Sequence, residues 1–143
     1  MRGRIGAVAS LLYPLLALLL IKRLGSHLLA PAATALKLYP AAVNIVLLYV
    51  FSASLVRPPS FAERMAMIEH PVLPPRAARY AHAVTKVWCI FFILNGSLAL
   101  ATAFWASDGI WALYNGLIAY ALMGCLAGAE WLVRHRARLY DPA

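Results

Sequence analysis

Four long apolar runs dominate the sequence, at residues 5–21, 39–56, 87–106 and 110–133. They are 17, 18, 20 and 24 residues long, and a helix needs about 20 apolar residues to cross a bilayer. Only 13% of all residues are charged and 64% are hydrophobic, so the chain cannot supply the polar surface of a soluble domain. The sequence therefore predicts one all-α membrane domain over residues 1–143, a polytopic helical bundle of about four transmembrane helices.

The N-terminal part of the chain allows two interpretations. Its basic start and leucine-rich centre resemble a signal peptide, but the basic pair at 22–23 stands where an uncharged cleavage region belongs, which favours a retained membrane helix. A proline and a lysine interrupt residues 27–38, so we expect an interfacial or re-entrant piece there, with part of a longer helix as the alternative. The second span then begins at residue 39, with Pro40 in its first turn, where a missing N–H costs little.

The basic residues set the expected orientation. The net charge is +8, and Lys and Arg gather in the loop 57–86 and in the C-terminal tail, whereas the hairpin tip around Asp108 has none. Basic loops stay in the cytoplasm, so we expect this loop and, by counting spans, both termini to be cytoplasmic. No nucleic-acid motif accompanies the charge, so no nucleic-acid partner is expected.

Two tryptophan pairs frame the last two apolar runs. Trp88 and Trp105 are 17 residues apart, and Trp111 and Trp131 are 20 apart. These separations correspond to about 25 and 30 Å along a helix, close to the thickness of a hydrocarbon core. Because indole prefers the headgroup boundary, we expect the four side chains to form two aromatic belts.

The basic loop contains a helix of its own. Ser60 and Glu63 have the spacing of a capping box after two prolines. Phe61, Met65 and Ile68 follow at positions that share one helix face. We therefore expect a short amphipathic helix lying at the inner membrane surface.

Three basic residues precede or begin the third span. Arg76, Arg79 and Lys86 lie on a helix that we expect to run from residue 76 into this span without a break. At this position they would meet lipid headgroups. Anchoring is the favoured interpretation over a substrate-binding arm.

Four polar side chains at membrane depth are the candidates for function: Asn44, Asn95, Asn115 and Glu130. Asparagine can bond one helix to another, so such bonding is the first interpretation and a polar pocket the second. Asn95 and Asn115 lie at different depths, so they are not expected to pair with each other.

Glu130 is the acidic residue within a predicted span. It lies at about the depth of Lys86 on the neighbouring predicted helix, so we expect an ion pair between them, with Arg79 or Arg134 as substitutes. A proton-carrying carboxylate is the alternative.

Gly116, Gly124 and Gly128 lie on one ridge of the last span, and the GxxxG spacing indicates helix packing or self-association. The sequence contains no catalytic or cofactor motif and no metal-ligand spacing. We therefore expect no enzymatic activity, no cofactor and no metal site.

Several strings from residue 39 onward resemble a known family. They are YPAAVN (39–44), FAERM (61–65), LPP (73–75), VTKVWC (84–89), FILNG (92–96) and WALYNGLIAY (111–120). The family comprises small bacterial inner-membrane proteins with no assigned reaction, encoded beside fatty-acid-like synthases, acyl carrier proteins and lipid exporters of aryl-polyene-type clusters. The layout is also distantly similar to the intracellular septation protein A family.

The resemblance implies a bacterial inner-membrane protein in an envelope lipid or pigment context. It favours a non-enzymatic accessory or scaffold subunit of a lipid or polyene synthesis or export system. Partners would be membrane lipids and either other membrane proteins or further copies of this chain. The alternative is a small transporter or carrier of a lipid-like or small-molecule substrate.

Overall fold

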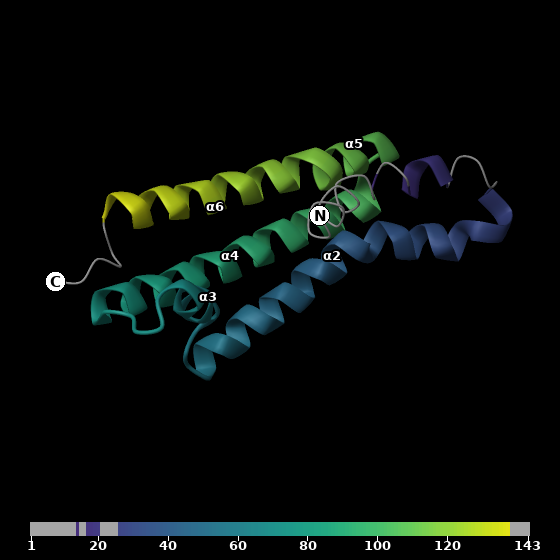
Figure 1. Cartoon of the computed structure of the whole chain (residues 1–143). Helices are drawn as coiled ribbons and strands as arrows, with labels where there is room; N and C mark the ends of the chain where they lie inside the picture. Colours follow the sequence, from purple (N-terminus) through teal and green to yellow (C-terminus); the bar gives the residue numbers. More distant parts are fainter. Residues whose placement is uncertain (1–13, 15–16, 21–25, 138–143) are drawn as a thin grey trace. The chain divides into compact units, whose positions relative to one another are not determined.

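The computed structural model describes residue 14, residues 17–20 and residues 26–137, and within these residues it contains helices and no strand (Figure 1). The labelled elements are α2 (Ser26–Val56), α3 (Phe61–Glu69), α4 (Pro75–Trp105), α5 (Asp108–Leu113), the π-helix η1 (Tyr114–Ile118) and α6 (Ala119–Arg136). The all-α prediction is confirmed for this part of the chain.

Three stretches of helix are long and apolar enough to cross a membrane: Ala32–Val56, Pro75–Trp105 and Asp108–Arg136. They correspond to the last three predicted spans and are compatible with a multi-pass membrane protein. The predicted span at 5–21 lies outside the described residues except for residues 14 and 17–20, which are helical.

Helix α2 decides between the interpretations of its first half. Residues 27–38 are part of a longer helix and not a separate piece, because one helix continues from Ser26 to Val56. Pro40 therefore lies inside the helix and not in its first turn. A proline removes one backbone N–H, and apolar helices in membranes tolerate this because neighbouring groups re-satisfy the backbone.

Helix α4 confirms that one unbroken helix leads from the basic loop into the third span. It begins at Pro75, whose fixed φ suits the first position of a helix. After Trp105 the chain turns at once, and Ser107 caps α5 by accepting a hydrogen bond from the Ile110 N–H at 3.4 Å.

The last span differs from the prediction in one turn. At Tyr114–Ile118 the chain forms a π-helix, and the Ala119 N–H bonds to the Tyr114 carbonyl five residues back. Insertions of this kind widen a helix locally and are frequent at functional sites. No residue pattern in the sequence predicts this π-helix.

The described residues divide into two compact units. The first unit is Met1–Val43 with Asn95–Gly124, and the second is Asn44–Leu94 with Cys125–Ala143. Helices α2 and α4 contribute residues to both units. Each unit has its own buried core, and the two are described separately below.

Candidate functional site

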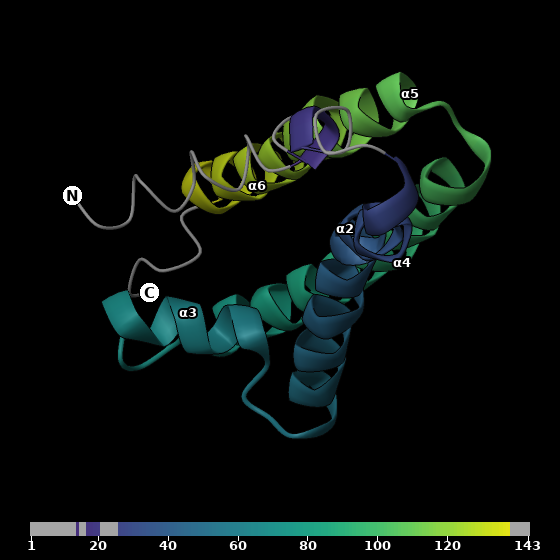
Figure 2. The same cartoon turned by 90° about the vertical axis from the view of Figure 1, so that its right-hand side faces the viewer.

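In the second unit, the neighbouring helices hold the beginning of α3. The Phe61 N–H donates to Ser54 Oγ of α2 at 2.8 Å, and the Ala62 N–H donates to Thr85 Oγ1 of α4 at 3.1 Å. The first N–H groups of a helix have no partner within it. Here they are satisfied by hydroxyls of two long helices, which fix α3 in position beside the first part of α4 (Figure 2).

The predicted capping-box residues also lie in place. The Glu63 carboxylate accepts a hydrogen bond from the Ser60 N–H at 2.5 Å, and Ser60 is the N-cap of α3. Arg64 is tied back to its own loop, since Nε donates to the Pro59 carbonyl at 2.8 Å. Two side chains of α3 therefore hold the loop that precedes this helix.

A group of aromatic rings packs beneath α3. We call these rings the aromatic cluster; its members are Phe51, Phe61, Trp88, Phe91 and Phe92. The Phe51 and Phe61 rings are stacked with centroids 4.1 Å apart, and Phe92 meets Phe51 edge-on at 5.0 Å. Such arrangements contribute about 0.5–1.5 kcal/mol per pair beyond burial. Phe61 thus joins α3 to the core.

The outer side of α3 stays open. Met65 is 50% exposed and Ile68 is 73% exposed, and Val72 just beyond the helix is also exposed. The three residues predicted to share one face therefore do not all face the same way, because Phe61 packs inward while the other two are exposed. We call residues 57–74 the α3 platform: a segment fixed to two long helices that presents an apolar surface outward.

In the first unit, an ion pair joins the hairpin to α2. Lys37 Nζ pairs with Asp108 Oδ1 across 71 residues of sequence. The indole N–H of Trp111 donates to the Lys37 carbonyl at 3.1 Å. Trp111 is fully buried against Ala17, so it packs inside the protein and the predicted aromatic belt is wrong for this residue.

The other predicted belt residues differ among themselves. Trp88 belongs to the aromatic cluster, whereas Trp105 and Trp131 are exposed. Exposure is what a headgroup belt requires, so the belt interpretation stays a prediction for these two residues.

Each of the two predicted asparagines takes part in a separate side-chain hydrogen bond between α4 and the π-helix η1. The Tyr114 hydroxyl donates to Asn95 Oδ1 at 2.9 Å, and Asn115 Nδ2 donates to Thr102 Oγ1 at 3.1 Å and to the Trp111 carbonyl at 3.0 Å. Both asparagines are buried, at 5% and 3% exposure. No hydrogen bond between the two asparagines occurs in the described structure, in agreement with the prediction.

One atom of this arrangement stands out. Asn115 Oδ1 is buried and has no hydrogen-bond partner among the described residues. A buried acceptor without a partner is costly and marks the place of a water or a ligand group in many proteins. Together with the ion pair, these side chains form what we call the tip network: Lys37, Asn95, Thr102, Asp108, Trp111, Tyr114 and Asn115.

Asn44 lies in the second unit, while Asn95 and Asn115 lie in the first. It is buried in α2 at 6% exposure. The structure thus brings two of the three predicted asparagines into one network.

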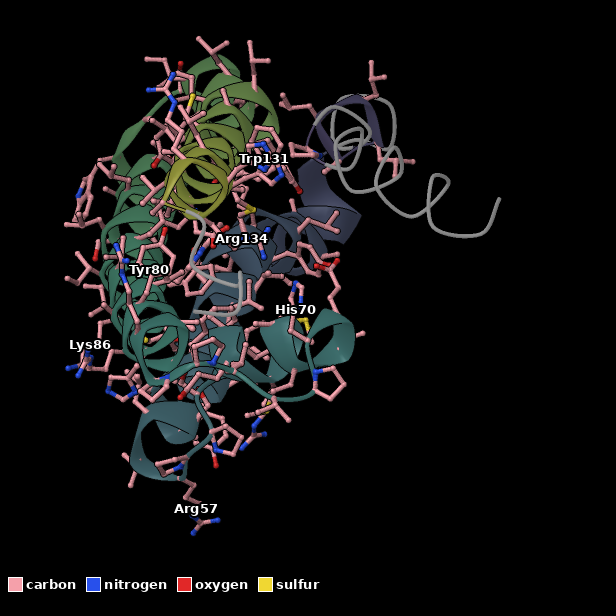
Figure 3. The ribbon with its side chains drawn as sticks, turned by 60° about the vertical axis from the view of Figure 1, so that its left-hand side comes forward. Arg57, His70, Tyr80, Lys86, Trp131 and Arg134 are labelled. Atoms are coloured by element: carbon pink, nitrogen blue, oxygen red, sulfur yellow. The ribbon has the colours of Figure 1, made fainter. Side chains whose placement is uncertain are left out.

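Glu130 pairs with Arg134 on its own helix and not with Lys86. Arg134 Nε lies 3.7 Å from Glu130 Oε1, whereas Lys86 is exposed and points outward in Figure 3. The prediction of a Glu130–Lys86 pair is wrong, and the named substitute Arg134 is found. On α4, residue 86 is about 200° around the helix from Val84, which lines the side facing α6.

Arg76 and Arg79 are exposed in the first turns of α4, as expected of interfacial charges.

The three glycines predicted to lie on one ridge have different surroundings. A Cβ at Gly116 would meet Pro14 at 3.6 Å, whereas Gly124 and Gly128 face open space among the described residues. The GxxxG pair therefore packs against no described part of this chain.

Among the described residues, no three His, Cys, Asp or Glu side chains gather as a ligand set for a metal ion. Comparison with protein-family models, curated proteins and solved structures found no match to the chain.

Proposed function

We propose that this protein is a non-enzymatic accessory subunit of the bacterial inner membrane, a scaffold for an envelope lipid or polyene synthesis or export system. One observation carries the proposal. The α3 platform is fixed to α2 and α4 through Ser54 and Thr85, yet its outer residue Ile68 is 73% exposed. A surface that is both fixed and exposed suits a contact with another component.

Basic residues at both ends of the platform support a cytoplasmic position. Arg57 begins the platform, Arg76 and Arg79 lie in the first turns of α4, and all three are exposed. Basic residues next to membrane spans favour the cytoplasmic side, where acyl-processing proteins would be found. In this orientation both ends of the chain are cytoplasmic and Asp108 lies outside.

Photocrosslinking in intact membranes tests the proposal. A crosslinker at Ile68 should capture a protein of the acyl-synthesis or export machinery, because Ile68 is the most exposed apolar residue of α3. A crosslinker at Tyr49, an exposed position on the predicted membrane-spanning part of α2, is the matched control and should capture lipid. Lipid alone from both positions would contradict the scaffold function.

Charge reversal gives a second test. Changing Arg76, Arg79 and Lys86 to Glu should weaken binding to the partner or to the membrane surface, while Glu130→Gln should leave scaffold function nearly intact. Unchanged binding after the triple reversal would contradict the proposal.

A small-molecule or lipid carrier is the second candidate, favoured by the buried and unpartnered Oδ1 of Asn115. A polar path inside the membrane needs such a group to meet its cargo. Under this function Glu130→Gln or Asn115→Leu should abolish activity at unchanged stability and abundance. Loss of stability with retained activity would leave Asn115 as a bond between helices.

A further inference from the structure

An apolar groove runs between α4 and α6 in the second unit. It has a volume of about 240 Å³ and is open along one side. Its walls are mostly aliphatic, with Val84 and Val87 from α4 and Leu126 and Val133 from α6. An open apolar groove between two helices that are long and apolar enough to cross a membrane has the chemistry of a site for part of an acyl chain.

Polar groups mark one end of this groove. The Tyr80 hydroxyl of α4 donates to the Glu130 carbonyl of α6 at 3.2 Å, and Glu130 Oε1 lies 3.7 Å from Arg134 Nε. Figure 3 shows Tyr80 and Arg134 on the two helices. The apolar lining therefore ends where an ion pair and a hydroxyl begin.

The charge at this end is positive. Arg134 and Arg136 lie in the last turn of α6, and Arg76 lies four residues before Tyr80, on the same face of α4. Glu130 is the acidic side chain that lines the groove, and it is already paired. An anionic headgroup would thus find excess positive charge at the end of an apolar groove.

We propose that the groove binds one acyl chain of an anionic phospholipid, with the phosphate of its headgroup held at the Arg134 end. The phosphate competes with the Glu130 carboxylate for Arg134. This competition makes a prediction of unusual sign, because removing the Glu130 charge should strengthen lipid binding. The inference does not depend on the proposed scaffold function, since it rests on the groove lining and on Arg134.

Native mass spectrometry of the full-length protein in detergent tests the site. The protein is titrated with phosphatidylglycerol and, separately, with phosphatidylcholine of the same acyl chains. Phosphatidylglycerol should bind at least fivefold more tightly, because each basic residue near an anionic headgroup contributes about that factor. Equal affinity for the two lipids would overturn the proposal.

Paired variants locate the binding. Ala129→Phe fills the groove and should remove the preference for phosphatidylglycerol, whereas Ala127→Phe, at an exposed alanine outside the lining, should not. If both variants bind like the original protein, another surface binds the lipid and the proposal is wrong. Melting curves identify a variant that fails to fold, and the charge variants then decide.

The charge variants change no volume in the groove. Arg134→Gln should lower phosphatidylglycerol affinity about fivefold, and Arg57→Gln, at an exposed basic residue outside the groove lining, should change it less than twofold. Glu130→Gln should raise the affinity by a similar factor. Weaker binding after Glu130→Gln would show that the carboxylate holds the site together, and it would overturn the competition we describe.

Discussion

The two units of this protein hold their helices together in different ways. The tip network joins α2 to α5 by an ion pair and a hydrogen bond, and it joins α4 to η1 by hydrogen bonds such as that from Tyr114 to Asn95. The aromatic cluster packs α3 on α2 and α4 through rings such as Phe51 and Phe92. The first arrangement requires particular partners, and the second requires shape and volume.

Each unit contains parts of all three candidate spans, so both kinds of contact act between apolar helices. Within a bilayer the lipid tails are as apolar as the side chains, so association depends on packing and on bonds between helices. At α3 the rings also cover the backbone of a short helix that could not persist alone. We therefore expect volume changes to be most damaging around α3 and single polar changes to be milder at the tip network.

The largest effect is expected at the aromatic cluster. Phe51→Ala should lower the free energy of unfolding by about 3 kcal/mol, because it leaves a cavity beneath Phe61 and Phe92. Equilibrium unfolding in lipid–detergent micelles measures the loss. Tyr49→Ala, at an exposed side chain nearby on α2, should cost under about 0.5 kcal/mol. Equal losses would mean that the cluster is not a core.

A smaller effect is expected in the π-turn. Asn115→Leu should lower the free energy of unfolding by about 0.6–2 kcal/mol per lost interhelical bond. Asn115 Nδ2 and Thr102 Oγ1 are the two partners of one hydrogen bond. The double variant with Thr102→Val should therefore lose less unfolding free energy than the sum of the losses of the two single variants. Strict additivity would show that the two side chains do not interact.

The Lys37–Asp108 pair should contribute about 1 kcal/mol or less, because its side chains are 23% and 43% exposed. Asp108→Asn should therefore shift thermal unfolding slightly, and the shift should shrink as salt is raised. Exchanging the two residues, with Lys37→Asp and Asp108→Lys together, should recover part of the loss. A double exchange worse than both single changes combined would argue against the pair.

The smallest stability effect is expected at Glu130. Its partner Arg134 is four residues away on the same helix, and such pairs contribute about 0.2–0.5 kcal/mol. Glu130→Gln should therefore change the melting temperature little. Its shift should lie within a degree or two of the shift caused by the control Lys86→Gln. A large loss would mean that Glu130 has a further structural partner.

Local patterns predicted much of the second unit. The capping-box residues, the unbroken α4 and the helix at 61–69 all follow from nearest-neighbour spacing. The division of the apolar residues of α3 did not, because Phe61 turns inward only where Phe51 is present to receive it. Glu130 pairs with Arg134 and not with the predicted Lys86 for a similar reason. The facing sides of α4 and α6 decide which basic side chain lies within reach of the Glu130 carboxylate.

The first unit was harder to foresee because its contacts join residues far apart in sequence. Lys37 and Asp108 are 71 residues apart, yet a lysine within an apolar run needs a counter-charge, and this signal was available. The π-turn had no such signal. The spacing of the tryptophans predicts Trp111 at a membrane boundary. Its side chain is buried because it packs against Ala17, and the spacing of tryptophans carries no information about this contact.

Side-specific cysteine labelling tests most directly whether the hairpin tip and the α3 platform lie on opposite sides of a membrane. With Cys89 and Cys125 replaced by Ala, Gly109→Cys is placed in open space at the hairpin and Arg57→Cys at the exposed start of the platform. In intact cells an impermeant maleimide should label Gly109→Cys at once and Arg57→Cys only after the membrane is opened. Labelling of both positions from the same side would contradict the membrane-spanning arrangement of α4 and α6.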